Sequence, residues 1–539
     1  MIFNISSSSG ENFTNIGGYI FNLRIIFRLV KMGVTNQIGF DNEKYLKEQT
    51  SAILERVNRF NHKLYLEFGG KILFDYHAAR VLPGFDPNVK MRLLQILKDK
   101  IDVILCIHAG AIERKKVRAD FGITYDVDAL KTIDDFREWG INITAVVITR
   151  YQDQPPAKAF KNKLELRGVR VYLHYPTKGY PTDVDLIVSD NGYGANEYIR
   201  TSNPIVVVTG PGPGSGKLAT CLCNLYHEYK KGVKAGYAKF ETFPIWDISV
   251  DHMVNLAYEA ATVDLDDKVL IDDHHLKAYN IKTVNYNRDI EAFHLLKRIF
   301  EKITGGESMY QSPTDMGVNR ASAGIVNDSM IKEASYQEII RRYFRCAVEY
   351  AMGLTDKETL NRIISIMKNT GARAEDRKVV LPAREAAKEA EKSGKGNAGI
   401  YCGAAIELKD GTIITGKNSP LMHASSSLIL NATKHLAGFP DKMYLLPENI
   451  IDSVTHLKKD ILDGKMVSLD VDETLIVLGI SALSNPAAKM ALENLKLLRN
   501  CEVHLTHIPT PGDEAGWRKL KVNLTCDPEY SSKSLFISG

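Results

Sequence analysis

The stretch PIVVVTGPGPGSGK, residues 204–217, decides how the rest of the chain is interpreted. Its β-branched run predicts a buried strand, and the apolar-periodic segment after Lys217 predicts a helix. A strand, a glycine loop, a lysine and a helix together aim backbone N–H groups and a helix N-terminus at one point, which is how proteins hold phosphate. We therefore expect a phosphate-binding loop made by Gly210, Gly212, Gly214, Ser215, Gly216 and Lys217.

This loop departs from the P-loop pattern at two positions. The pattern places four residues between a first glycine and the Gly-Lys pair, and it follows the lysine with Ser or Thr. Here Pro211 takes the first-glycine position and Leu218 follows the lysine. The usual magnesium-binding hydroxyl is therefore missing, with Thr220 as a nearby substitute, and the need for magnesium stays open. The plainer alternative is a glycine-rich turn that only joins a strand to a helix.

Composition is typical of a soluble globular protein with several domains. The chain has 539 residues, of which 25% are charged and 44% hydrophobic. A net charge of +4 is small for this length, so we expect no nucleic-acid partner. Seven cysteines without a CxxC motif argue against a disulfide framework and predict a reducing, cytoplasmic setting. The apolar patch at 19–30 is too short and too charged to span a membrane, and no membrane partner is expected.

Changes in pattern divide the chain into five predicted parts. They are a disordered extension at 1–31, an N-terminal α/β domain at 32–200, a P-loop-like α/β region at 201–330, a helical region with a linker at 331–395, and a smaller C-terminal α/β domain at 396–539.

Short apolar runs alternate with helical patterns in the first half of the chain. The expected strands are 70–75, 102–107, 143–149, 169–174 and 185–188, and the expected helices include 41–64, 88–99, 129–139 and 157–167. Strands that alternate with helices predict a parallel sheet covered on both faces, in Rossmann-like layers. In such sheets, ligands bind beyond the carboxyl ends of the strands.

Polar side chains near these strand ends and in the later polar loops are the catalytic candidates. They are Asp75, His77, Arg80, His108, Glu113, Asp247, His252, Asn287 and Arg288. Histidines, carboxylates and arginines in one place can transfer protons and bind an anionic substrate. The alternative is that these residues cap helices and line loops. No spacing matches a zinc motif, so no metal site is expected.

The C-terminal part predicts two strands joined at an Asp410–Gly411 turn, followed by a helix at about 422–437. This order resembles the opening of cytidine-deaminase-like folds, in which the helix begins with a metal-binding His-x-Glu motif. His423-Ala424-Ser425 stands at that place, and no Pro-Cys-x-x-Cys follows. We therefore expect a domain of this kind without zinc chemistry, with a structural, oligomerising or substrate-binding role.

Residues 470–474, DVDET, match the DxDxT signature of haloacid-dehalogenase-like phosphatases. Too few residues follow Thr474 for a domain of that fold. We expect a buried helix over 475–487 instead.

Several stretches together resemble one known family. They are FDYHAARVLPGF (74–85), RADFGITYD (118–126), GPGPGSGK (210–217), KFETFPIWD (239–247), NYNRDIE (285–291), SPTDMGVN (312–319) and GKNSPLMHAS (416–425). These strings resemble the mainly bacterial, uncharacterised family called domain of unknown function 1846, from about Met32 to the C-terminus. The resemblance implies a cytosolic, multi-domain α/β protein that forms homo-oligomers, and it implies no established activity or catalytic residues.

Three functions are compatible with these observations. The first is a transferase or ligase that acts on a nucleotide or a phosphorylated metabolite held at the glycine loop. The second is a non-catalytic, nucleotide-sensing oligomer. The third is an ATP-dependent peptidase, a label carried by some members of the resembling family, although the residues offer no zinc motif and no identifiable Ser or Cys nucleophile.

Overall fold

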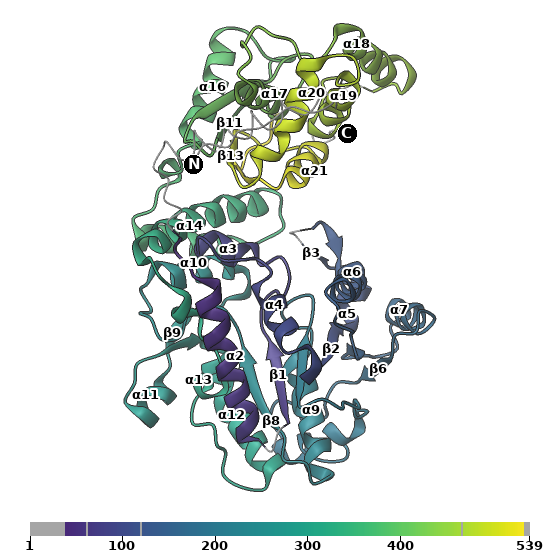
Figure 1. The fold of residues 1–539 in the computed structure, drawn as a ribbon, viewed down its shortest axis with the longest axis vertical. Helices are drawn as coiled ribbons and strands as arrows, with labels where there is room; N and C mark the ends of the chain where they lie inside the picture. Colours follow the sequence, from purple (N-terminus) through teal and green to yellow (C-terminus); the bar gives the residue numbers. More distant parts are fainter. Residues whose placement is uncertain (1–37, 61–62, 119–120, 465–466, 533–539) are drawn as a thin grey trace, which may run out of the picture.

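A six-stranded parallel sheet forms the centre of the N-terminal half (Figure 1). The computed structural model describes residues 38–60, 63–118, 121–464 and 467–532. The extension predicted at 1–31 lies outside the described residues. The strands are β1 (Leu64–Phe68), β2 (Ile101–His108), β5 (Ala145–Thr149), β6 (Val171–His174), β7 (Ile205–Thr209) and β8 (Gly236–Phe240), and their order across the sheet is β6-β5-β2-β7-β1-β8. The predicted parallel α/β architecture is confirmed.

Helices cover both faces of this sheet, as strand alternation requires. Tyr65 of β1 donates a hydrogen bond to Glu228 of α9 (Lys217–Lys230), so this side of β1 faces α9. Tyr237 of β8 is in register with Tyr65, so Gly236, the residue before it, faces the other side of the sheet. There it lies against Phe60 at the end of α2 (Asn42–Arg59). The apolar runs of both faces are buried because neither face is exposed to water.

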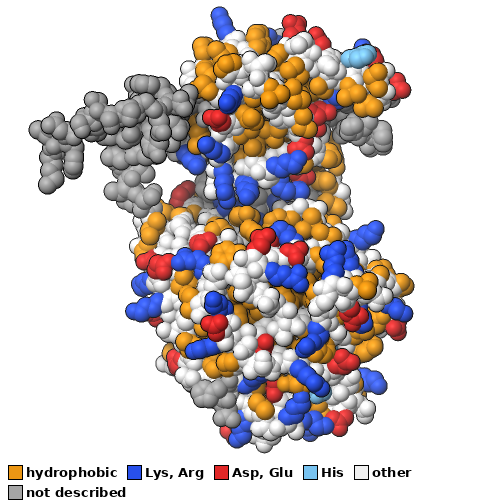
Figure 2. Space-filling model, turned by 45° about the vertical axis from the view of Figure 1, so that its right-hand side comes forward, with side chains coloured by type: hydrophobic (Ala, Val, Ile, Leu, Met, Phe, Trp, Pro, Cys, Tyr) orange, Lys and Arg blue, Asp and Glu red, His pale blue; other side chains and the backbone are white. Residues whose placement is uncertain are grey.

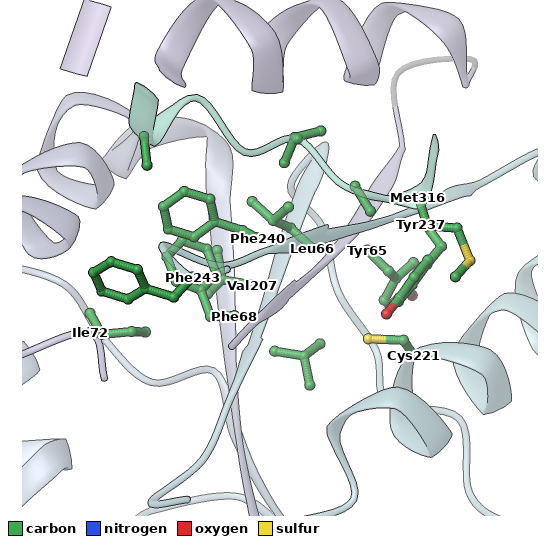
Figure 3. Close-up of a cluster of buried hydrophobic side chains, with 14 of the residues drawn as sticks. Tyr65, Leu66, Phe68, Ile72, Val207, Cys221, Tyr237, Phe240, Phe243 and Met316 are labelled. Atoms are coloured by element: carbon green, nitrogen blue, oxygen red, sulfur yellow. The ribbon is translucent and has the colours of Figure 1, made fainter. Parts of the chain in front are cut away.

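The core between these layers is aromatic and tightly packed. Figure 3 shows Phe68, Phe240 and Phe243 grouped at one end of β1 and β8, with Leu66 and Val207 beside them. The ring centroids of Phe68 and Phe240 are 4.5 Å apart in an edge-on arrangement, which suits the aromatic quadrupole.

Two of the expected strands are wrong. Residues 70–75 form turns after β1, because Gly69 and the left-handed Gly70 end the strand and leave Ile72 and Leu73 as buried loop side chains. Residues 185–188 belong mostly to a short helix, α8 (Val184–Ile187), which is capped by the Asp183 carboxylate. Both runs are too short for periodicity to separate a strand from other buried segments.

The other helices of the first half lie where apolar periodicity predicts them. They are α4 (Val89–Ile96), α6 (Tyr125–Glu138) and α7 (Pro155–Glu165). Two short helices that were not predicted, α3 (Tyr76–Val81) and α5 (Ala109–Glu113), follow β1 and β2. Beyond β8 come α10 (Met253–Ala261), the small antiparallel pair β9 (Val269–Ile271) and β10 (Val284–Tyr286), α11 (Asp273–Tyr279), α12 (Asn287–Thr304) and α13 (Pro313–Met316).

A long helix, α14 (Asp328–Ala351), lies between the large sheet and the C-terminal domain (Figure 1). It contacts α3 and α10 on one side and β14 on the other, and α15 (Lys357–Thr370) packs beside it. No helix among the described residues is both long and apolar enough to cross a membrane.

The C-terminal domain is a smaller α/β unit with a mixed sheet. Its strands are β11 (Gly403–Glu407), β12 (Ile413–Lys417), β13 (Glu502–Leu505) and β14 (Asn523–Cys526), in the order β12-β11-β13-β14, and only β13 and β14 are parallel. Helices α16 (Val380–Lys392), α17 (Ala424–Ala437), α19 (Val471–Ser481), α20 (Pro486–Asn494) and α21 (Pro511–Leu520) surround it. The boundary expected near 395 stays a prediction, with α16 lying against β11.

The DxDxT stretch is part of a helix. Asp470 is the N-cap of α19, its carboxylate accepts the Glu473 amide, and the Glu473 side chain accepts the Asp470 amide in return. This reciprocal capping box explains the acidic pattern without a phosphatase. The helix expected over 475–487 begins earlier and stops at Ser481, because Pro486 starts the separate helix α20.

Candidate functional site

The glycine loop lies at a topological switch point of the large sheet. β7 sits between β2 and β1, and the connection from β2 runs outward through α6 to β5 while that from β7 runs the other way through α9 to β8. Cys106 of β2 contacts Thr220 of α9, whereas its neighbour Leu105 packs in the cluster of α6, so the two helices cover opposite faces. Such a switch point opens a crevice beyond the strand ends, which is where open α/β sheets bind ligands.

The loop itself is held tightly by its neighbours. Thr149, the last residue of β5, donates through Oγ1 to the carbonyl of Ser215 at 2.8 Å, and Ser215 Oγ donates to the carbonyl of Gly212 at 2.5 Å. A Cβ on Gly210 would lie 2.5 Å from the Cys106 carbonyl oxygen, so only glycine fits there. These contacts fix the loop between β2 and β5.

The N-terminus of α9 has no side-chain cap. Its N-cap is Gly216, which has a left-handed φ of 90° and offers no hydroxyl or carboxylate to the first amides. Gly214 also has positive φ and faces open space. Lys217 folds over the loop, with its Nζ 3.4 Å from the Gly212 carbonyl. The loop therefore presents free amide donors and one cation, as an anion requires.

Several positively charged side chains lie near His108, at the same edge of the sheet as the loop. His108 ends β2 and caps α5 by accepting the Ala111 amide at 3.1 Å. Burial, followed by the nearby charges of Arg150, Arg114 and Lys116, lowers the pKa of His108. On the face drawn in Figure 2, Lys and Arg side chains gather where the two parts of the molecule meet. An imidazole kept neutral among three cations fits an anion-binding crevice.

Thr220, the possible substitute for the missing magnesium hydroxyl, is occupied. It is fully buried, its Oγ1 donates to the Gly216 carbonyl at 2.9 Å, and Cys106 Sγ lies 3.4 Å away. The side chain therefore points into the core rather than toward the loop.

Three candidates that follow β1 bind other parts of the protein. Asp75 caps α3 and forms a buried ion pair with Lys90 at 2.9 Å. His77 and Arg80 face Glu338 of α14, with Nδ1 of His77 3.1 Å and Nε of Arg80 2.8 Å from its carboxylate oxygens. These side chains hold α3 in place and do not face the glycine loop in any contact of the described residues.

Of the remaining candidates, one is exposed and four have local partners. Glu113 is exposed at the end of α5. Asp247 accepts a hydrogen bond from Ser322, His252 caps α10 and lies 2.7 Å from Asp328, Asn287 accepts the Lys268 amide, and Arg288 forms an ion pair with Asp267. In the part of the chain that the structure describes, His108 is the candidate that is linked to the loop, because it is in register with Thr149, which donates to the Ser215 carbonyl.

A second polar cluster, which the sequence did not predict, lies at the carboxyl end of β8. Lys239 lies 2.5 Å from Asp289 of α12 and 3.2 Å from Glu241. Burial would lower the pKa of Lys239, but Asp289, Glu241 and Glu67 together raise it above its ordinary value. Burial raises the pKa of Glu241 to about 7 against the opposing effect of Lys239, with Asp289 and Glu67 adding to the rise.

Glu241 owes its position to a glycine in the neighbouring strand end. A Cβ on Gly69 would lie 2.3 Å from the Glu241 side chain, so the carboxylate occupies the space that Gly69 leaves. The alternation of Tyr237 and Lys239 along β8, continued by Glu241 directly after it, is the sequence signal that indicates this cluster.

The C-terminal domain holds a buried acid–histidine pair where the deaminase-like motif would lie. His423 precedes α17, and its Nδ1 lies 2.8 Å from Asp513. Burial lowers the pKa of His423, but the hydrogen bond and charge of Asp513 outweigh it and raise the value above normal. The Ser425 hydroxyl, which stands where that motif has its glutamate, has no hydrogen-bond partner among the described residues. Among the residues that the structure describes, no group of three or more His, Cys, Asp or Glu side chains is arranged to hold a metal ion.

Comparisons with known proteins identify relatives without a known activity. The family model for the N-terminal domain of unknown function DUF1846 matches residues 38–371, and the model for its C-terminal domain matches 375–536. A UPF0371 protein of Clostridium botulinum (strain Langeland) is 57% identical over 504 residues, which is 93% of this chain and 100% of the relative. A UPF0371 protein of Clostridium tetani is 56% identical over 503 residues, with the same coverage.

Proposed function

The chain belongs to the DUF1846 family, whose name states no activity. From the geometry of the site we propose that the glycine loop binds the phosphate of a nucleotide or a phosphorylated metabolite. On this proposal the protein is a transferase or ligase that acts on the bound molecule, using the loop in the manner of a P-loop. The observation that carries the proposal is an uncapped helix N-terminus at the sheet's switch point, preceded by left-handed glycines and covered by Lys217.

Charge and chemistry support a phosphate group over a neutral ligand. Arg150, Arg114 and Lys116, which lie near His108 at the same edge of the sheet, add to the positive charge of Lys217. The α9 macrodipole, from a helix of 14 residues, contributes further attraction for an anion at its first turn. Group transfer from such a molecule depends mainly on positioning and on charge stabilisation, both of which a rigid loop at a sheet edge provides.

A thermal-shift screen of nucleotides and phosphorylated metabolites tests this proposal. At a ligand concentration of 100 times Kd, the wild-type protein should gain about 2.7 kcal/mol of stability. Lys217→Ala should lose most of that gain, because it removes the cation that lies over the loop. Lys230→Ala is the matched control: it removes a lysine from the last turn of the same helix, far from the loop, and should keep the gain.

Two outcomes of the screen would contradict the proposal. One is that no phosphate compound stabilises the wild type, and the other is that Lys217→Ala and Lys230→Ala respond alike. Magnesium should change binding little, because Leu218 offers no hydroxyl and Thr220 is turned into the core. A repeat of the screen with EDTA tests this point.

Turnover separates the transferase or ligase from the sensing oligomer. A nucleotide that stabilises the protein and is consumed with an acceptor present favours the enzyme. A nucleotide that binds unchanged and alters the mass of the particle in light scattering favours the sensor.

A further inference from the structure

A polar cavity of about 180 Å³ opens at the carboxyl end of β8, beside the cluster of Lys239 and Glu241. Its walls come from α2, β8, α12 and the segment 313–320, which lies alongside β8 and pairs with it through Gly317 and Lys239. Parts of the chain that are distant in sequence thus build one cavity. The side chains that matter to its chemistry are Arg56, Lys239, Glu241, Trp246, Asp289 and Arg320.

Two arginines of this cavity are bound only to neutral groups. Arg56 donates to the backbone carbonyls of Asp315 and Gly317 at 2.8 and 3.1 Å, and Arg320 donates to the carbonyl of Asn319 at 2.9 Å. Within the described ranges, neither guanidinium forms an ion pair with an Asp or Glu side chain. Their charges are therefore held in place but not neutralised.

The geometry of the surroundings keeps these guanidinium groups fixed. The Trp246 ring lies 6.0 Å from the Arg320 guanidinium carbon, and its own Nε1 donates to the Asn319 carbonyl at 2.9 Å. Arg56 projects from the last turn of α2 onto two carbonyls at the C-terminal end of α13. A planar guanidinium that is already oriented loses little entropy when it binds a carboxylate through two hydrogen bonds.

We propose that this cavity binds a small carboxylate, held by Arg56 and Arg320, and that Glu241 takes up a proton when the ligand enters. That the carboxylate is the second reactant of the transferase or ligase rests on the proposed function. Binding of the carboxylate does not depend on the proposed function, because none of these side chains belongs to the glycine loop.

A carboxylate suits the cavity better than a phosphate. Asp289 and Glu241 also line the wall, and they repel a group that concentrates up to two negative charges on one centre more strongly than an acid that carries one charge on each carboxylate, as malonate does. Among the described residues, α12 is the only helix of eight or more residues whose N-terminus adjoins the cavity, and Asp289 already lies in its first turn. Arg56 and Arg320 each present one guanidinium fork. Together they suit a small molecule with two carboxylates, one on each arginine, or a single carboxylate bound by both arginines.

The expected uptake of a proton follows from the charged and titratable groups that surround Glu241. These are Lys239 near the end of β8, Glu67 on β1 and Asp289 on α12. Tyr258 on α10 and Tyr286 on β10 lie behind Glu241, and Arg56, Arg59, Arg320, His275 and Asp315 line the cavity. The pKa of Glu241 is already raised to about 7. A bound anion disfavours the charged carboxylate further and raises that pKa, so binding at pH 7.5 should draw a proton from solution and weaken as pH rises.

Isothermal titration calorimetry with malonate, in two buffers of different ionisation enthalpy at pH 7.5, tests both carboxylate binding and proton uptake. The wild type should bind malonate with proton uptake and should not bind malonamide, which has the same shape without charge. Arg320→Met should weaken binding about tenfold or more, as the loss of one charged hydrogen-bond pair does. Arg320→Lys, which keeps the charge without the fork, should fall between the two.

The variant Glu241→Gln separates proton uptake from ligand binding. This variant should bind malonate at pH 7.5 with no proton uptake and with an affinity that no longer falls above pH 7. Arg137→Met is the charge-matched control, because Arg137 is exposed on α6 and pairs only with Asp134; it should bind as the wild type does.

Several results would overturn the inference. They are the absence of malonate binding, equal binding by Arg320→Met and Arg137→Met, unchanged proton uptake in Glu241→Gln, or binding of inorganic phosphate that competes with malonate and is the tighter of the two. Lys217→Ala distinguishes this failure from that of the phosphate site. If Lys217→Ala binds malonate normally while no phosphate compound binds the wild type, the proposed function fails and the carboxylate site stands.

Discussion

Two glycines of the loop have the same backbone handedness but different surroundings. Gly214 has a φ of 74° and no atom within 4 Å of an added Cβ. Gly216 has a φ of 90°, and an added Cβ would lie 2.7 Å from the Thr149 side chain. Thr149 is itself held by its hydrogen bond to Ser215, so it has little room to move. Backbone strain is therefore common to the two positions, whereas steric overlap is specific to Gly216.

Alanine at these two positions should have unequal effects. Gly214→Ala should cost about 1–2 kcal/mol of unfolding free energy, from left-handed strain alone. Gly216→Ala should cost about 1–3 kcal/mol more through overpacking against Thr149, and it should abolish the ligand-induced thermal shift. Urea unfolding of both variants measures the difference. Equal losses would show that the loop moves away from Thr149 freely, against the tight loop described above.

Sequence alone predicted some site residues because of where they stand along single strands. His108 and the glycine loop each follow a buried apolar run, and neighbouring strands bring both to one edge. The raised pKa of Glu241 could not be predicted in this way, because its environment comes from Gly69, Asp289 and Glu67, which are far from it in the chain. The chemistry of a side chain that depends on distant neighbours is set by packing and not by local pattern.

At the scale of elements, α14 is joined to α3 by one buried carboxylate. Glu338 is 1% exposed and accepts hydrogen bonds from Arg80, Arg341 and Arg342, with His77 3.1 Å away. Burial would raise the pKa of Glu338, but the three arginines hold it well below its ordinary value. The carboxylate therefore stays charged and neutralises part of a cluster that is otherwise positive.

Removing this charge should destabilise the protein strongly. Glu338→Gln removes the carboxylate that Arg80 and Arg342 share and leaves Arg341 with Glu502 alone, and breaking buried pairs in this way costs about 3–5 kcal/mol. Glu349→Gln, on the same helix, breaks an exposed pair with Arg345 and should cost less than about 1 kcal/mol. Denaturant unfolding of both variants measures the two values. Similar losses would show that Glu338 has no special role.

The elements that were predicted wrongly share one cause. The run at 185–188 is a helix because Asp183 caps it, and the run at 70–75 is a loop because Gly69 and Gly70 end the strand before it. Long amphipathic segments such as α2 and α14 were predicted well, since many residues repeat the same signal. For runs of four to six apolar residues, capping and glycine positions decide the structure more than apolar periodicity does.

At the scale of the whole molecule, α14 connects the large sheet domain to the C-terminal domain. Arg341 donates from Nε to Glu338 at 2.8 Å and from Nη1 to Glu502 of β13 at 3.0 Å. Phe344, one turn later, lies with its ring centroid 4.7 Å from that of His504 on the same strand. The two parts matched by the separate family models are therefore joined by a charged and an aromatic contact from a single helix.

This arrangement predicts how the two parts unfold. In wild-type protein they should unfold together in calorimetry, because loss of either part removes the partners of α14. Arg341→Met leaves Glu338 and Glu502 each short of one cation across the interface, so the transition should broaden or split into two, with the lower one shifted by several degrees. Arg345→Met, four residues along the same helix, breaks only an exposed pair with Glu349 and should keep a single transition. If Arg341→Met also unfolds in one step at the wild-type temperature, Arg341 does not couple the domains, and the aromatic contact of Phe344 with His504 would be the connection to test by Phe344→Ala.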